Sequence, residues 1–258
     1  MTLKTSFFKL IYAFLLSFFL ISCSTTPYTH RKQVILLSPA QEMAMGYQAE
    51  REILAKASIN HDPRLNAMVR RVGMRIAKAA NRPDYHWSFH VINGNQINAF
   101  CLPGGKIFVY TGLLKLIDND DQLATVIAHE VAHAIARHGA ERISMMQLGD
   151  LGRKLAIKAA GARYQNVINQ VYGIGANYGV FLPYSRKFEY EADEIGIYLM
   201  AKAGYDPNQA IVFWKKMMQY TKNMRKPPEF ASTHPSDINR IRRIQAIIAR
   251  LKRNHVIR

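Results

Sequence analysis

Residues 118–138 read DNDDQLATVIAHEVAHAIARH, and this stretch decides the fold. Its apolar side chains recur every three or four residues, which is the period of an α-helix, while Asp118 to Asp121 supply capping and acidic first-turn side chains. His129 and His133 are four residues apart, so both imidazoles project from one helix face and can bind a single ion. The stretch therefore predicts a helix over residues 121–138 that carries two metal ligands.

The residue after the first histidine, Glu130, adds a third functional group to this helix. It is close enough to take a proton from metal-bound water, but it is not aligned to be a ligand itself. HExxH at residues 129–133 therefore matches a zinc hydrolase, in which one helix supplies two ligands and the general base. The alternative is a chance match, which is disfavoured because these polar residues point toward an apolar helix face.

A catalytic zinc ion needs a third protein ligand, and the sequence offers it further along the chain. Residues 188–193 read Phe-Glu-Tyr-Glu-Ala-Asp and fall in a predicted helix, in which Glu189 and Asp193 share a face. Glu189 could bind the zinc ion while Asp193 accepts the free N–H of a ligand histidine. Spacing alone leaves Glu191 and Glu194 open as competing ligands.

Capping signals and helical periodicity predict the other helices. Ser38-Pro39 has the form of an N-cap followed by proline at the first helical position, and it opens a helix through about Lys56. Asp62-Pro63 does the same for a helix that ends near Asn81. Further helices are predicted over residues 112–117, 141–160, 186–203, 207–223 and 236–253, with an irregular stretch from Gln165 to Ser185.

A run with a period of two interrupts these helices. His86 to Ile92 alternates like a strand, Asn93-Gly94 is a hairpin turn signal, and Gln96 to Leu102 is the predicted return strand. Pro103-Gly104-Gly105 is a second turn, which leads into a short β-rich run over Lys106–Tyr110. The prediction is an α+β fold, mostly helical, with a small β-sheet beside the motif helix.

Residues 1–22 have the pattern of a signal peptide. Lys4 and Lys9 give a positive start, and Leu10 to Ile21 give an apolar stretch too short for a comfortable membrane span. The boundary Leu20-Ile21-Ser22-Cys23 resembles the bacterial lipobox, in which a small residue precedes a cysteine that becomes acylated. An uncleaved anchor with an incidental cysteine is the alternative, but the order of these features favours lipidation, and several acyl chains anchor a protein stably.

The residues after Cys23 predict a location and a domain organisation. Ser24 rather than aspartate follows the cysteine, which in Gram-negative lipoproteins implies transport to the outer membrane. We therefore expect an outer-membrane lipoprotein of the bacterial cell envelope that faces the periplasm. The predicted parts are a signal peptide over residues 1–22, a lipidated cysteine and polar tether over 23–37, and one domain over 38–258.

The chain is strongly basic, with a formal net charge of +17. Such a charge favours anionic surfaces such as phospholipid headgroups, lipopolysaccharide or nucleic acid. The predicted last helix is rich in arginine and lysine, which usually marks a solvated face, and on a membrane-tethered protein it would be attracted to anionic headgroups. Nucleic acid is not expected as a partner, because of the export signal and because no aromatic-interleaved basic motif is present.

Four blocks carry a family resemblance. They are Asn98–Gly105 before the strand at residues 106–110, His129–Gly139, Ser185–Asp193, and Ser232–Pro235 with Arg240-Ile241. In order and spacing they resemble the HExxH zinc endopeptidases that include the CAAX prenyl protease, HtpX and BepA. Cys101 stands where the family more often has alanine, and the chain lacks the transmembrane helices and the helical repeat domain of some members. It looks like the peptidase domain alone.

The resemblance implies a zincin fold with a gluzincin-type site and one zinc ion per chain. It makes Glu189 the third ligand beside His129 and His133, with Glu130 as the catalytic base. It also favours an active-site role for His234, either stabilising the oxyanion or blocking zinc in a resting enzyme; the alternative is that His234 caps a helix start before Pro235. The substrate would add an extended strand to a sheet edge formed by Lys106, Ile107, Phe108, Val109 and Tyr110.

The function implied by these features is zinc-dependent endopeptidase activity on envelope proteins. Family analogy suggests that the substrates are misfolded or unassembled proteins, as in protein quality control. The alternative is a zinc-containing chaperone or scaffold of the same fold that needs no proteolysis.

Overall fold

The computed structural model describes residues 23–160, 165, 182–222, 224–225, 228–235 and 237–256. The predicted signal peptide and most of the predicted irregular stretch lie outside the described residues. The helices are α2 (Pro39–Lys56), α3 (Pro63–Ala80), α4 (Thr111–Leu114), α5 (Asp120–Ile135), α6 (His138–Ala160), α8 (Leu182–Lys202), α9 (Asn208–Thr221), α10 (Glu229–Thr233) and α11 (Ile238–Arg253). The strands are β1 (Cys23–Thr25), β2 (Lys32–Val34), β3 (Ser88–Ile92), β4 (Ala99–Leu102) and β5 (Lys106–Tyr110).

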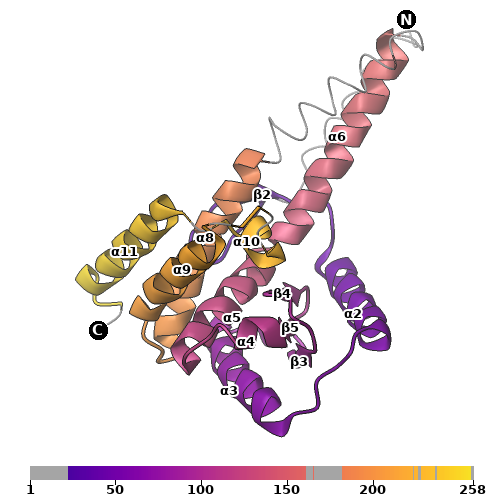
Figure 1. The fold of residues 1–258 in the computed structure, drawn as a ribbon. Coiled ribbons are helices and arrows are strands. Elements are labelled where there is room, and N and C mark those ends of the chain that lie inside the picture. The colour runs from indigo at the N-terminus through magenta and orange to yellow at the C-terminus, as the bar shows by residue number, and fades with distance from the viewer. Residues whose placement is uncertain are drawn as a thin grey trace, which may run out of the picture.

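Helix α5 lies at the centre of the fold. It packs on α3, α8, α9 and strand β4, so the small sheet lies on one side of it and α8, α9 and α11 on the other (Figure 1). Its N-cap is Asn119, whose side chain accepts a hydrogen bond from the Gln122 amide. Because neighbours surround α5, most of its side chains are buried and it is apolar around most of its circumference. The predicted mostly helical α+β fold is confirmed.

The predicted motif helix is too long at its C-terminal end. Arg137 has a positive φ of 60°, in the left-handed region, and it ends the helical path. A separate helix, α6, begins at His138 and projects away from the body of the fold (Figure 1). The chain therefore changes direction directly after the HExxH motif.

The two capping predictions before the sheet are confirmed. Ser38 caps α2 in a reciprocal capping box with Gln41, and proline follows it at the first helical position. Asp62 caps α3 by accepting a hydrogen bond from the Arg64 amide, and Asn81 closes this helix in the left-handed conformation.

The predicted hairpin between the first two strands of the sheet is wrong. The strand order is β3-β5-β4, with β3 parallel to β5 and β4 antiparallel to it. Strands β3 and β4 run in opposite directions but are not hydrogen-bonded to each other, and the Gly94 carbonyl accepts instead from the Gly112 amide at the start of α4. The tight turn is at Gly104 and Gly105, whose φ values of 79° and 82° suit glycine.

This strand order also overturns the predicted substrate strand. Lys106, Ile107, Phe108, Val109 and Tyr110 form the central strand, and both of its hydrogen-bonding edges are paired with β3 and β4. A central strand has no free backbone groups to offer a peptide. Its nearly continuous apolar burial reflects that central position. The strand of this sheet that has an open edge beside α5 is β4.

The predicted polar tether is also wrong, because residues 23–34 are structured. Strands β1 and β2 pair antiparallel, and β2 packs on α6. Thr26 and Gln33 are buried, and the side chain of Arg31 is only 13% exposed. The segment after Cys23 is therefore docked on the domain.

The C-terminal helices cover the far side of α5. Helix α8 begins at Leu182, four residues before the predicted start, and the short helix α10 was not predicted. Helix α11 packs on α8 and α9 through Ile241, Ile244 and Ile248. Arg240, in the first turn of α11, is buried and so does not belong to the solvated basic face expected on this helix. Among the described residues, no helix has an apolar stretch long enough to span a lipid bilayer.

Candidate metal centre

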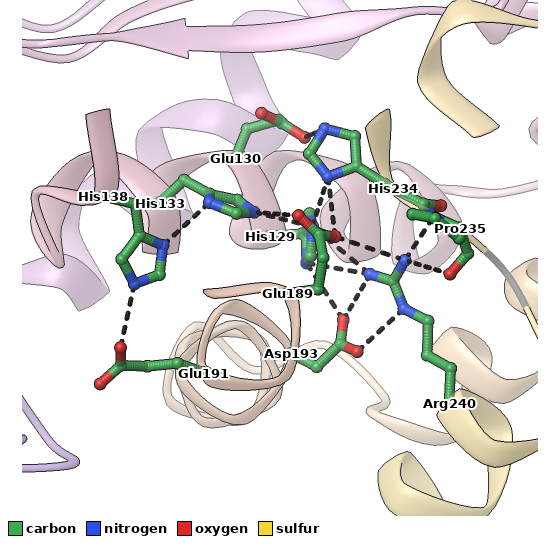
Figure 2. Close-up of polar contacts among 10 residues, drawn as sticks. All are labelled: His129, Glu130, His133, His138, Glu189, Glu191, Asp193, His234, Pro235 and Arg240. Carbon is green, nitrogen blue, oxygen red and sulfur yellow. Dashed lines mark hydrogen bonds and ion pairs between the residues drawn. The ribbon is translucent and has the colours of Figure 1, made fainter. Parts of the chain in front are cut away.

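Four side chains from three parts of the chain converge beside α5 (Figure 2). His129 and His133 come from α5, Glu189 comes from α8, and His234 follows α10. Each offers one ligand atom, and these atoms all lie within 4.8 Å of one another. The structure thus brings together both predicted histidine ligands, the predicted third ligand and the predicted active-site histidine.

The spacing of these atoms fits a tetrahedral zinc site. His129 Nε2 lies 3.1 Å from His133 Nε2 and 3.2 Å from a Glu189 oxygen, while His234 Nδ1 lies 2.9 Å from the same oxygen. Ligands at zinc distances in a tetrahedron are about 3.4 Å apart. Imidazole nitrogens with one carboxylate are also a donor set that zinc prefers. The residues present therefore fit the ion that the motif implies.

Close approach of α8 to α5 places Glu189 at the centre. Gly196 makes this possible, because a Cβ there would lie 3.2 Å from the His129 amide nitrogen. The two competing carboxylates point elsewhere: Glu191 contacts His138, and Glu194 pairs with Arg250 at the surface. Burial raises the pKa of Glu189, but the three neighbouring imidazoles outweigh it and hold that pKa well below its usual range.

Asp193 contacts the outer nitrogen of His129, as the sequence predicted. Its Oδ1 lies 3.1 Å from His129 Nδ1, so the imidazole can donate there and keep Nε2 for a metal. Burial and Arg240 lower the pKa of His129, but the Asp193 and Glu189 carboxylates raise it to about 9. Metal binding at Nε2 needs this nitrogen to be free of a proton.

Arg240 is a site residue that the sequence reasoning did not assign. Its guanidinium binds both oxygens of Asp193, at 2.6 and 2.9 Å, and stacks 3.4 Å from the ring centroid of Trp214. It also donates to the carbonyls of His234 and Pro235, so it joins α8, α9 and the segment before α11. Arg240 stands in one of the resemblance blocks, but its basic neighbours made it look like a surface residue.

His138 and Glu191 form a second chain of contacts that was not predicted. His138 Nδ1 lies 2.9 Å from His133 Nδ1, and its Nε2 lies 3.0 Å from Glu191 (Figure 2). In a continuous helix, residues five apart do not face each other, so this contact depends on the turn at Arg137. A sequence pattern that assumes an unbroken helix cannot find it.

Glu130 is buried close to His234, and one oxygen of its carboxylate is an unused hydrogen-bond acceptor. Its Oε1 has no hydrogen-bond partner in the described part of the chain, and His234 Nε2 is 3.5 Å from it. Buried polar atoms are usually paired, so this one marks a place for a water or substrate group. Burial raises the pKa of Glu130 to about 8, and a cation in the centre would lower it again.

The comparisons with known proteins agree with this geometry. The model of peptidase family M48 matches residues 63–248. The chain is 37% identical to mitochondrial metalloendopeptidase OMA1 of Schizosaccharomyces pombe over 222 residues, which cover 85% of this chain and 64% of the relative. It is 32% identical over 245 residues to the Saccharomyces cerevisiae protein of that name, covering 85% and 69%.

A bacterial protein is also similar. The chain is 32% identical over 212 residues to the β-barrel assembly-enhancing protease of Escherichia coli, covering 80% of this chain and 43% of that relative. The chain thus spans between two fifths and about two thirds of the length of these relatives.

Proposed function

The chain belongs to peptidase family M48, and on this premise we propose that it is a zinc-dependent metalloendopeptidase that holds one zinc ion. The family resemblance expected from the four sequence blocks is confirmed by this match. The relatives named above are a metalloendopeptidase and a protease by their names, which supports the proposed reaction type.

The observation that carries the proposal is the position of Glu130 beside the four donor atoms. His129, His133 and Glu189 would hold the ion. Asp193 would orient His129 and His138 would orient His133, each through the Nδ1 atom of the ligand ring. A bound zinc ion lowers the pKa of a water molecule and polarises the scissile carbonyl. Glu130 has a free, buried acceptor to take the proton from that water, and it would deliver it to the leaving amine.

His234 has two proposed roles. Its Nδ1 belongs to the donor set, so in the observed arrangement it would fill the fourth position and keep the centre at rest. Its Nε2 faces Glu130, so with substrate bound the imidazole would place a donor beside the reacting groups. We propose that the imidazole then donates to the oxyanion of the substrate.

The substrate backbone would bind at the open edge of β4, which replaces the edge first expected at Lys106–Tyr110. Strand β4 covers Ala99–Leu102 and packs directly on α5. An extended peptide that adds to a sheet edge is held by main-chain hydrogen bonds, which do not depend on its sequence. Such binding suits unfolded segments of many proteins.

We further propose that the substrates are misfolded or unassembled proteins of the bacterial envelope. This location follows from residues 1–22 as a signal peptide and from lipidation at Cys23, which would attach the protein to the outer membrane on the periplasmic side. The peptidase domain would cover residues 38–258, with residues 23–37 docked on it. The basic α11 would favour anionic headgroups of the membrane.

The test compares the purified full chain with Glu130→Gln. We expect about one zinc per chain in both proteins by elemental analysis, and cleavage of an unfolded model protein by the wild type alone. Wild-type protein without zinc would overturn the proposed cofactor. Equal cleavage by both proteins would overturn the mechanism. A cellular function that survives Glu130→Gln would favour the chaperone alternative instead.

A further inference from the structure

A buried chain of polar contacts runs outward from His133 to the N-terminal segment. His133 Nδ1 lies 2.9 Å from His138 Nδ1, and His138 Nε2 lies 3.0 Å from Glu191 Oε2. Arg31 Nε donates to the same Glu191 oxygen at 2.7 Å. These contacts thus join α5, α6 and α8 to the turn between β1 and β2.

The N-terminal segment encloses the outer end of this chain. Thr26 and Thr29 both donate to the other oxygen of Glu191, Oε1. Arg31 also binds Glu141 of α6 through both terminal nitrogens, at 2.9 and 2.7 Å. The two carboxylates are 5% and 4% exposed, so these bonds are shielded from water.

Metal binding at His133 decides which atom donates and which accepts in every hydrogen bond from His133 to Glu191. This inference rests on the proposed zinc site. If His133 Nε2 is a ligand, the proton of its neutral ring lies on Nδ1 and is donated to His138 Nδ1. His138 must then carry its own proton on Nε2 and donate it to Glu191. Glu191 must be an ionised acceptor, which is what two hydroxyls and a guanidinium at its oxygens require.

We propose that Arg31 is a positioning residue for the metal centre, which acts through Glu191 and His138 on the orientation and tautomer of His133. The N-terminal segment is therefore part of the metal-binding apparatus, although it is remote from the metal. Full metal affinity requires that this segment stays docked.

The shape of the guanidinium explains why arginine stands at this position. Its two terminal nitrogens hold Glu141, which leaves Nε aimed at Glu191. A lysine has a single charged nitrogen and cannot serve both carboxylates in this fork geometry. The turn itself is fixed, because the Arg31 amide donates to Thr26 Oγ1 and the Thr26 amide donates to the Arg31 carbonyl.

The other histidine ligand has an equivalent arrangement. His129 contacts a carboxylate, Asp193, which Arg240 holds through both oxygens. Each proposed ligand imidazole is thus fixed by an arginine-bound carboxylate, directly for His129 and through His138 for His133. Arg240 lies within the residues matched by the family model, whereas Arg31 lies before them.

The test measures zinc affinity of the metal-free full chain by competition with a chelator. Arg31→Gln should weaken zinc binding by about 10–100-fold, the usual cost of losing an outer partner of a ligand. Arg71→Gln is the matched control, because Arg71 makes a bidentate but exposed ion pair with Asp120 and its loss changes the charge equally. Its zinc affinity should equal that of the wild type.

A double variant separates positioning from a general structural role. If Arg31 acts through His138, adding Arg31→Gln to His138→Phe should cause no further loss of zinc affinity. Nitrogen NMR of the zinc-loaded wild type should show His138 protonated on Nε2. In Arg31→Gln the His138 tautomers should become mixed. Thr29→Val removes one bond to Glu191 and serves the same comparison if Arg31→Gln does not fold.

Three results would overturn the inference: unchanged zinc affinity in Arg31→Gln, equal losses in Arg31→Gln and Arg71→Gln, or additive losses in the double variant. If Thr29→Val is used in place of Arg31→Gln, unchanged zinc affinity in Thr29→Val also overturns the inference. A wild type that binds no zinc refutes the proposed cofactor itself, whereas stoichiometric zinc with an insensitive Arg31 refutes only the positioning role.

Discussion

Arg240 holds both carboxylate oxygens of Asp193 inside the core, at 2.6 and 2.9 Å. Both side chains are at least 97% buried, so neither charge can be solvated if the other is removed. Breaking one partner of such a pair leaves a buried charge uncompensated. This pair therefore couples the stability of the fold to the orientation of His129.

Replacing Arg240 by methionine should destabilise the protein by about 3–5 kcal/mol, because Asp193 loses its counter-charge in a buried place. Urea unfolding of the metal-free protein measures this change. Arg71→Met is the control, since its ion pair with Asp120 is exposed and should contribute at most about 1 kcal/mol. Similar values for the two variants would refute a structural role of the buried pair.

Glu130 and Glu189 should separate as base and ligand. Glu130→Gln keeps every ligand, so it should bind zinc like the wild type and lose proteolysis by about 10²–10⁴-fold. Glu189→Gln replaces an anionic donor with a neutral amide, so it should lower zinc affinity, with activity partly recovered in excess zinc.

Zinc titration and turnover at saturating metal measure both effects. Glu194→Gln is the control. Glu194 lies on α8 like Glu189 but pairs with Arg250 at the surface, so this variant should change neither zinc affinity nor turnover. If Glu130→Gln loses the metal and Glu189→Gln keeps it, the two roles are reversed.

His234→Ala should retain about one zinc per chain, because three protein ligands remain. Its turnover at saturating zinc should fall by about 10²–10³-fold, the cost of an oxyanion donor. Elemental analysis and peptide cleavage give the two values, and the exposed His61→Ala is the control. Turnover that rises in His234→Ala would mean that the side chain only blocks the centre.

Glu50 should contribute stability that depends on pH. It accepts hydrogen bonds from Ser88 and His90 and lies 3.4 Å from Lys106 Nζ; these contacts outweigh its burial and lower its pKa. A lowered carboxyl pKa stabilises the fold above the unfolded value of about 4.3, and this stability is lost as pH falls further.

Unfolding free energies of wild type and Glu50→Gln should therefore differ at pH 7 and converge on acidification. The measurement is urea unfolding at several pH values. A difference that stays constant down to pH 3 would show that Glu50 does not titrate with folding.

Cys23→Ala should fold like the wild type but carry no lipid, because the thiol is the proposed acylation site. Labelling cells with a clickable fatty acid measures this. Cys101→Ala is the control and should be labelled fully. Equal labelling of Cys23→Ala and wild type would exclude the lipobox.

Local signals predicted the elements that contain them. Ser38 and Asp62 start their helices because the cap bonds involve residues at most three positions away. His129 and His133 share a face of α5 for the same reason, since helical spacing alone sets their positions. The hairpin at Asn93-Gly94 was predicted wrongly because strand pairing depends on distant partners, and β5 inserts between β3 and β4.

The sequence by itself determined the family, the motif helix and the residue types that a zinc hydrolase needs, because these follow from local spacing and from recognisable blocks. Residue spacing left Glu189, Glu191 and Glu194 open as the third ligand, and the family resemblance implied Glu189. The tertiary structure gives the physical reason, because the three carboxylates lie on one helix and differ in what packs against them. It also brought Arg31 and Arg240 to the site. These contacts join residues between 47 and 160 positions apart, so no local pattern of the sequence encodes them.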